Sequence, residues 1–304
     1  MVEHKDASDK EQEIREINTG IMAIKGSLLK KYIIQLKPNN KQGELYLTDI
    51  VKNAVTDNVT ISSLVCDNVS EVMGINNKNQ LAEAERIYQQ KQAKDLMSNG
   101  LTIKDPNRFD CRGNLIFGKD CVIDVNVVFE GENELGKNVL ISPNCIIKNA
   151  KICDHAEIKA NSIIENSIIG SHSTVGPFAR VRPETKVGNY AKIGNFVEVK
   201  KSTIGDKSKV PHLSYVGDSS IGQDVNISAG VITCNYDGVN KHQTIIEDGA
   251  FIGSDTQLIA PITVGKNATI GAGSTITQDA PSEKLTLSRK KQKTIDNWKR
   301  KKKQ

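Results

Sequence analysis

The chain has 304 residues, of which 38% are hydrophobic, enough for one large or two ordinary domains with a sizeable core. Its net charge of +5 is uneven, because residues 289–304 hold nine Lys or Arg and one Asp, a balance of +8 that leaves −3 for the rest. A body of that sign argues against nucleic acid as a partner, and we interpret the basic tail as a solvated segment rather than a binding arm.

Membrane and metal partners are not indicated either. No apolar run approaches the ~20 residues that span a bilayer, and no signal peptide opens the chain, so we expect a cytoplasmic protein. The six cysteines form no CxxC pair and fit free, partly buried thiols in a reducing compartment.

A helix is predicted between residues 81 and 97. Apolar residues recur there at helical spacing, and the following Asn99-Gly100 pair suits a helix C-terminus. We interpret residues 77–114 as a connecting helix and linker.

A hexapeptide repeat begins near residue 115. Large apolar residues recur every six residues, with four spacings of five. The series is Phe117, Ile123, Phe129, Leu135, Ile141, Ile147, Ile152, Ile158, Ile164, Ile169, Val175, Val181, Val187, Ile193, Val199, Ile204, Val210, Val216, Ile221, Ile227 and Thr233, resuming at Ile246, Ile252, Leu258, Val264, Ile270 and Ile276. Each short hexad is the third of a group of three, which predicts triangular coils of about 18 residues.

The repeat therefore predicts a left-handed parallel β-helix over residues 115–287. A second register, four residues after each apolar one, holds small or β-branched residues that should also point inward. An antiparallel sandwich would need hairpin turns every 8–12 residues, which the constant phase does not supply. After Thr233 the step between coils becomes 25 residues, so we expect an inserted loop around residues 234–241.

Coil stacking places residues of equivalent register about 4.8 Å apart, so the outward side chains can be compared between coils. Arg182 and Lys200 should lie one above the other, and two like charges at that distance favour an anion between them. Glu198 should lie directly below Tyr215 in the next coil.

His212 lies three residues before Tyr215, and we predict it on the same side of the solenoid. A neutral imidazole can take a proton from an amine nucleophile, and Glu198 is the candidate to orient it. His4, His155, His172 and His242 lack such partners and are interpreted as surface residues. His155, His172 and His212 are expected in different hexad positions, which argues against a carbonic anhydrase of this fold, because that enzyme would need histidines at coil spacing to bind zinc.

Four segments carry a resemblance to a known family: RVRPETKVGNYAKIGNFVEVKKS, KVPHLSYVGD, AGVITCNYDG and FIGSDTQLIAPITVG. They resemble the acetyltransferase half of the bacterial bifunctional N-acetylglucosamine-1-phosphate uridyltransferase/glucosamine-1-phosphate N-acetyltransferase family. The resemblance implies direct attack of the amine of glucosamine 1-phosphate on acetyl-CoA, in sites between the β-helices of a homotrimer.

The resemblance also implies site residues. It makes His212 the catalytic base and Glu198 the carboxylate near it. The sugar-phosphate site would comprise Arg182, Lys200, Tyr215, Asn226 and Lys241. Acetyl-CoA contacts would come from Ala229, Asn235, Tyr236, Ser254, Ala272 and Arg289. Ser228 stands where the family motif has glycine.

The N-terminal segments MVEHKDASDKEQEIREINTGI, ELYLTDIV and SEVMGINNKNQLAEAERIYQ resemble the last part of the family's α/β uridyltransferase domain. By this resemblance Glu3 and Asn18 match UDP-sugar contacts, and Asn76 matches a ligand of Mg²⁺. The glycine-rich nucleotide-binding loop of that domain is not found, so we expect no uridyltransferase activity.

The domain organisation expected from the whole sequence has four parts. Residues 1–76 are a uridyltransferase remnant, 77–114 a connector, 115–287 the β-helix and 288–304 a basic tail. Another hexapeptide acyltransferase and a non-catalytic scaffold remain alternatives, although a scaffold would not need a histidine, a carboxylate and stacked cations at one corner.

Overall fold

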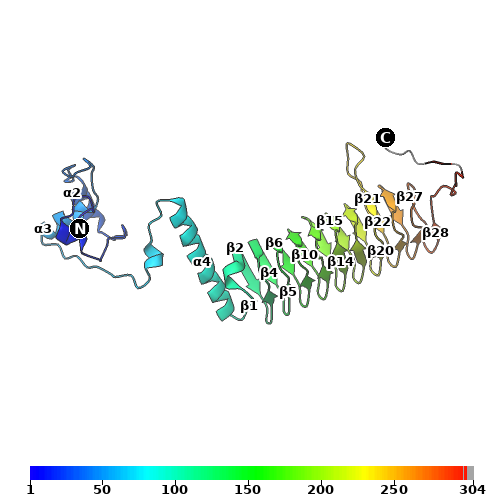
Figure 1. Ribbon diagram of the computed structural model, residues 1–304, viewed down its shortest axis with the longest axis horizontal. Coiled ribbons are helices and arrows are strands. Elements are labelled where there is room, and N and C mark those ends of the chain that lie inside the picture. The colour runs from blue at the N-terminus through cyan, green and yellow to red at the C-terminus, as the bar shows by residue number, and fades with distance from the viewer. Residues whose placement is uncertain (297, 300–304) are drawn as a thin grey trace. The chain divides into compact units, whose positions relative to one another are not determined.

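The computed structural model describes residues 1–296 and 298–299, and the end of the basic tail lies outside these residues. The chain divides into two compact units, residues 1–87 and the remainder from Tyr88 onward. Each unit is described separately (Figure 1).

The first unit contains short helices and, within residues 1–77, no strand. The helices are α1 (Asp9–Gln12), α2 (Gly26–Ile33) and α3 (Asp49–Thr56), with a 3-10 turn at Val69–Val72. Their small core consists of Tyr32, Ile50 and Ala54 with partly buried neighbours. Many other large apolar side chains of this unit are exposed, including Leu64 and Ile34.

The predicted helix is confirmed as α4 (Lys78–Ser98), and the boundary between the two units, after Ile87, falls within it. Gly100 follows it with a left-handed φ of 102°, and the amide of Leu101 donates to the Leu96 carbonyl, which closes the helix end. The last turns of α4 cover the first coil, where Ala93 is fully buried and the Gln89 amide donates to Asp110.

The solenoid has three parallel faces (Figure 1). The first face comprises β1 (Thr102–Ile103), β3 (Val122–Ile123), β5 (Leu140–Ile141), β8 (Glu157–Ile158), β11 (Thr174–Val175), β14 (Lys192–Asn195), β17 (Lys209–His212), β20 (Asn226–Ile227), β23 (Phe251–Ile252), β26 (Thr269–Ile270) and β28 (Leu285–Thr286). Parallel pairing thus begins at β1, ahead of the first regular hexad.

The other two faces share one continuous sheet because two long strands, β2 (Phe109–Phe117) and β4 (Val127–Leu135), run from one face to the next. The second face continues with β6 (Ile146–Lys148), β9 (Ile163–Glu165), β12 (Arg180–Val181), β15 (Glu198–Lys200), β18 (Tyr215–Gly217), β21 (Ile232–Cys234), β24 (Gln257–Ile259) and β27 (Thr275–Ile276). The third comprises β7 (Lys151–Ile152), β10 (Ser167–Ile169), β13 (Thr185–Val187), β16 (Thr203–Ile204), β19 (Ser219–Ile221), β22 (Thr244–Ile246) and β25 (Ile262–Val264).

The predicted register is confirmed. Val181 pairs with Val199 18 residues later, Ile147 pairs with Ile164 17 residues later, and Ile221 pairs with Ile246 across the inserted loop. Both inward registers form the core, in which Ile158, Ile193 and Cys145 have no exposed surface. Burial raises the pKa of the Cys145 thiol to about 11, and all six cysteines are free.

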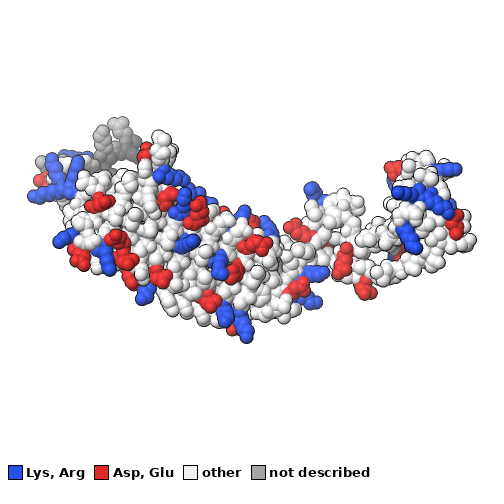
Figure 2. All heavy atoms as spheres, turned by 180° about the vertical axis from the view of Figure 1, so that it is seen from behind, with Lys and Arg blue, Asp and Glu red and all other residues white. Residues whose placement is uncertain are grey.

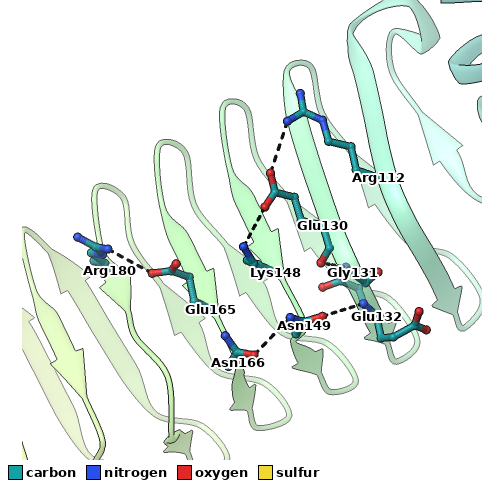
Figure 3. A network of polar contacts seen from close by, with 10 residues as sticks. Arg112, Glu130, Gly131, Glu132, Lys148, Asn149, Glu165, Asn166 and Arg180 are labelled. Atoms are coloured by element: carbon teal, nitrogen blue, oxygen red, sulfur yellow. Dashed lines mark hydrogen bonds and ion pairs between the residues drawn. The ribbon is translucent and has the colours of Figure 1, made fainter. Parts of the chain in front are cut away.

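Outward side chains also pair between coils, as Figure 3 shows. Glu130 contacts both Arg112 below it and Lys148 above it, while the Asn149 amide donates to Asn166. His155, His172 and Tyr190 stack at another corner, with ring centroids 4.6 and 4.7 Å apart. His155 and His172 therefore do lie at coil spacing, which corrects the expectation that their hexad positions differ, whereas His212 lies elsewhere with Asn195 as its partner. Along the coils seen in Figure 2, cationic and anionic side chains are interspersed, whereas cationic side chains gather at the C-terminal end of the described chain.

Candidate functional site

A column of cations on the second face forms the first part of the site. Val181 pairs with Val199, and the Arg182 amide donates to the Val199 carbonyl, so Arg182 and Lys200 occupy equivalent positions in adjacent coils. The Arg182 guanidinium also forms a 2.7 Å ion pair with Glu198, and this bond raises the pKa of Arg182. Tyr215 lies directly above Glu198, as predicted.

Lys241 reaches this column from the inserted loop. Its ammonium, with smaller contributions from desolvation and Arg182, holds the pKa of Lys200 below the ordinary lysine value. Asp218 raises the pKa of Lys200 only weakly. The positive charges of Arg182, Lys200 and Lys241 are therefore only partly compensated. Such a cluster is stabilised by a bound anion with several oxygen acceptors.

His212 ends β17 on the first face, and its main partner is Asn195 one coil below. The imidazole Nδ1 lies 2.6 Å from the Asn195 side-chain oxygen. An amide oxygen can only accept, so Nδ1 carries the proton and Nε2 is left with its lone pair.

Two expectations about this part of the site are corrected. Glu198 pairs with Arg182 rather than with His212, because both side chains extend from the second face. His212 and Tyr215 do not share a side, since Leu213 between them adopts a left-handed φ of 48° and turns the corner from the first face to the second. The two groups therefore flank one corner.

Small residues continue the His212 column toward the C-terminal end. The amide of Asp255 donates to the Ala229 carbonyl, and the amide of Gly273 donates to the Ser254 carbonyl, so Ala229, Ser254 and Ala272 occupy the same corner position in successive coils. Arg289 lies at the end of this row, where a methyl group built on Gly271 would be 3.7 Å from a guanidinium nitrogen. The row therefore places only small side chains in register between His212 and Arg289.

The loop between β21 and β22 is an ordered hairpin. Tyr236 and Lys241 form an antiparallel bridge, and the Asp237 carboxylate accepts from the Val239 and Asn240 amides at 2.8 and 2.6 Å. Asp237 also contacts His242 at 2.7 Å, so this histidine has a carboxylate partner that the sequence did not suggest. Tyr236 remains exposed, with its hydroxyl donating to the Gly238 carbonyl.

Two predicted contact residues lie differently from the rest. Asn235 is buried, and its amide donates to Asp218, so the side chain anchors the loop rather than facing an open path. Asn226 lies in β20 on the first face, where its amide contacts the Ser228 hydroxyl at 3.3 Å, and it is not brought to the cations of the second face.

The three residues of the N-terminal remnant are not brought together by the contacts of the first unit. The Glu3 carboxylate accepts from the Thr48 hydroxyl, the Asn18 side chain accepts from the Gly20 backbone amide, and the Asn76 backbone amide donates to the Gln80 side chain. Among the residues that the structure describes, no group of three His, Cys, Asp or Glu side chains could hold a metal ion. Over the same residues, no helix has the length and apolar character needed to cross a membrane.

Asn195 and Asp218 are site neighbours that the sequence did not single out. Asn195 is 17 residues before His212, so the coil register that pairs Glu198 with Tyr215 could have identified it. Asp218 is likewise 17 residues before Asn235, so the same register could have identified their contact.

The fold and this site define a hexapeptide-repeat β-helix of the bacterial transferase class. The model described as "Bacterial transferase hexapeptide (six repeats)" matches residues 243–278, and that of the "GMPPB C-terminal domain" matches residues 111–188. The chain belongs to the family of the bifunctional protein GlmU: it is 54% identical to the Marinobacter nauticus protein over 100% of its own length and 67% of that protein.

Further similarities have the same pattern. The bifunctional protein GlmU of Ruthia magnifica is 60% identical over 99% of this chain and 66% of its own length. The chain thus spans about two thirds of these curated relatives. A solved UDP-N-acetylglucosamine acyltransferase from Campylobacter jejuni is 18% identical, with a TM-score of 0.38 over 48% of this chain and 71% of that one.

Proposed function

We propose that the chain transfers the acetyl group of acetyl-CoA to the amine of glucosamine 1-phosphate, giving N-acetylglucosamine 1-phosphate. The observation that carries this proposal is the 2.6 Å contact between His212 Nδ1 and Asn195, at the inner end of the row of small residues. It leaves a basic nitrogen at the point where a linear acyl donor would end.

The chemistry follows from that nitrogen. A free amine attacks the thioester carbonyl carbon, and the new C–N bond forms as the C–S bond breaks. His212 Nε2 accepts the proton released by the amine and returns it to the departing thiolate. Asn195 is neutral, so it fixes the ring without the strong stabilisation of imidazolium that a carboxylate would give. No acyl-enzyme is required.

The cation column supplies acceptor recognition. Arg182, Lys200 and Lys241 would hold the phosphate of the sugar phosphate by charge-assisted hydrogen bonds, and Glu198 keeps the Arg182 fork in place. Tyr215 adds a neutral donor beside them. Phosphate binding also removes the mutual repulsion that lowers the pKa of Lys200.

The row from Ala229 to Ala272 would hold acetyl-CoA. Three coil steps at ~4.8 Å from His212 to Ala272 cover ~14 Å, on the order of an extended pantetheine arm. Arg289 at the far end would pair with an anionic phosphate of the coenzyme, with Tyr236 beside the arm and Asn235 holding the loop.

We further propose a homotrimer whose sites lie between copies. In one chain Asn226 lies on the first face and the cation column on the second, and a second copy would bring an Asn226 to the sugar phosphate from outside. The partners are then the small-molecule substrates and the chain itself. Six free cysteines fit a cytoplasmic location.

The product would serve UDP-N-acetylglucosamine synthesis for peptidoglycan and other envelope precursors. We propose that the 304 residues alone have no uridyltransferase activity, because the contacts of Glu3, Asn18 and Asn76 go to three different partners and do not bring these residues together. Residues 1–87 should therefore bind no Mg²⁺–UDP-sugar complex, and a titration of the chain with UDP-N-acetylglucosamine and Mg²⁺ checks this.

Thiol release tests the acetyltransferase proposal directly. The purified chain is given acetyl-CoA and glucosamine 1-phosphate, with glucosamine 6-phosphate and unphosphorylated glucosamine as matched acceptors. Release should be fastest with the 1-phosphate, because the cation column and the base then act on one molecule. Faster release with another amine would favour a different hexapeptide acyltransferase, and no release with any amine would favour a scaffold.

A further inference from the structure

A notch in the backbone of the second face lies beneath the Tyr215 ring. A methyl group built on Gly217 would be 2.5 Å from the Tyr215 hydroxyl oxygen and 2.7 Å from its Cζ atom, closer than real side chains approach. Gly217 is buried, and its φ lies outside the left-handed region, so another residue could adopt this backbone. Glycine is needed here for space.

Thr233 departs from the repeat in the coil above this notch, at the register position one residue before that of Gly217. The hexad places a large apolar residue at that position, but Thr233 is a fully buried threonine. A hydroxyl there costs stability unless it is hydrogen-bonded. It accepts from the Gly217 amide at 2.8 Å and donates to the Gly217 carbonyl at 3.1 Å.

These two bonds replace the regular ladder. Elsewhere on this face the amide after an inward residue donates to the next coil's backbone carbonyl, as Arg182 does to Val199. Between β18 and β21 only Tyr215 and Ile232 keep their pairing. Thr233 therefore holds Gly217 with a side chain where a backbone bond would otherwise fix the strand.

The notch lies within the cation column, because Lys200 pairs with Gly217 in the coil register. A ring lying over Gly217 thus occupies the position above Lys200. Glu198 and, more weakly, the Tyr215 phenol raise the pKa of Arg182, which places the phenol near that guanidinium as well.

We propose that Gly217 and Thr233 are positioning residues that hold the Tyr215 phenol over the Lys200 column, where its hydroxyl donates to a phosphate oxygen of the acceptor. This inference rests on the proposed function and deepens it. It assigns acceptor recognition to two residues that do not touch the substrate themselves.

A double-mutant cycle on thermal unfolding tests the notch without any substrate. Gly217→Ala should lower Tm in the protein with Tyr215, because the new methyl group displaces the ring. In the Tyr215→Ala background the same change should lower Tm much less. An equal loss in both backgrounds would show that the methyl group disturbs the backbone and would overturn the notch.

Steady-state kinetics test the positioning role. Gly217→Ala and Thr233→Val should each raise KM for the sugar phosphate about 2- to 10-fold, the size of one lost hydrogen bond, with KM for acetyl-CoA unchanged. Thr185→Val is the matched control, because Thr185 is buried in the same solenoid and its hydroxyl has no hydrogen-bond partner among the described residues. Equal rises for both substrates would overturn the role.

The wild-type chain separates this inference from the proposed function. If it releases no thiol with glucosamine 1-phosphate, the proposed function fails. Calorimetric titration with inorganic phosphate then replaces KM, and weaker binding by Gly217→Ala but not by Thr185→Val supports the inference. Unchanged phosphate affinity in Gly217→Ala would refute it.

Discussion

The regular coils and the inserted loop both bring cations to the candidate site, but they hold them differently. Lys200 extends from β15, between parallel strands on both sides. Lys241 extends from a hairpin in which the Asp237 side chain and the contact between Asn235 and Asp218 add to two backbone hydrogen bonds. A ladder repeats the same bond in every coil, whereas the loop has few backbone bonds and relies more on polar side chains. A change in a coil residue should therefore alter only one catalytic step or the binding of one ligand. Changes in the residues that support the loop should have smaller effects, because each removes only part of that support.

The largest expected effect belongs to a coil residue, His212. His212→Ala should lower turnover by about 10²- to 10⁴-fold, the usual contribution of a general base, while Tm and assembly stay unchanged because the side chain is exposed. His155→Ala is the matched control, an exposed histidine stacked at another corner of the solenoid. Stopped-assay thiol release checks both variants. Full activity in His212→Ala would remove the histidine from the mechanism.

The two lysines provide the direct comparison between coil and loop. Lys200→Ala and Lys241→Ala should each raise KM for the sugar phosphate about 10- to 100-fold, since each removes one charge-assisted hydrogen bond. KM for acetyl-CoA should stay constant. Lys186→Ala, an exposed lysine of β13, is the control. If both KM values rise together, the cations do not form a separate phosphate site.

Asn195 should give the next largest effect. Asn195→Ala removes the acceptor that fixes the His212 ring and should lower kcat about tenfold, the value of one good hydrogen bond. Asn195→Asp keeps an acceptor but adds a negative charge, which favours imidazolium and should move the acidic limb of the kcat profile to higher pH. An unshifted profile in the aspartate variant would mean that residue 195 does not contact the base during turnover.

The same contrast explains what could be predicted from the sequence. The hexad count correctly placed Val181 opposite Val199 and Glu198 opposite Tyr215, because a coil of fixed length converts sequence separation into contact. The count could not show whether Glu198 contacts Arg182 or His212, since both are near it in the register. Glu198 contacts Arg182, because the corner at Leu213 separates His212 on the first face from the second face.

The loop was predicted only as an insertion, for a physical reason. Once the repeat stops, spacing no longer implies contact, and side chains such as Asp237 and His242 find partners within the loop itself. The first 87 residues have the same difficulty, since no period relates Tyr32 to Ile50, although both lie in one small core. The family resemblance indicated Glu3, Asn18 and Asn76 as site residues in that region, but it did not predict which residues they contact.

The smallest expected effect concerns the loop's own carboxylate. Asp237→Ala removes the acceptor of the Val239 and Asn240 amides, so Lys241 should lose its fixed position and KM for the sugar phosphate should rise about 2- to 5-fold. Asp237→Asn is the matched variant, because its amide oxygen can still accept both bonds. Tm should hardly change, since the loop lies outside the ladders. A rise as large as that of Lys241→Ala would show that the loop has no other support.

The pH dependence of this contact has a definite sign. The Asn240 amide, then the His242 side chain and the Val239 amide, hold the pKa of Asp237 well below its ordinary value. A folded pKa below the unfolded value of about 3.9 means that the stabilisation is complete above that value and is lost only as the pH falls through the folded pKa. Between about pH 5 and 9 the ratio of KM values for Asp237→Ala and wild type should therefore stay constant, which parallel KM measurements across that range would check. A ratio that changes near neutral pH would mean that protonation of His242, rather than the Asp237 carboxylate alone, holds the loop in place. The loop would then differ from the coils also in depending on a group that titrates near neutral pH.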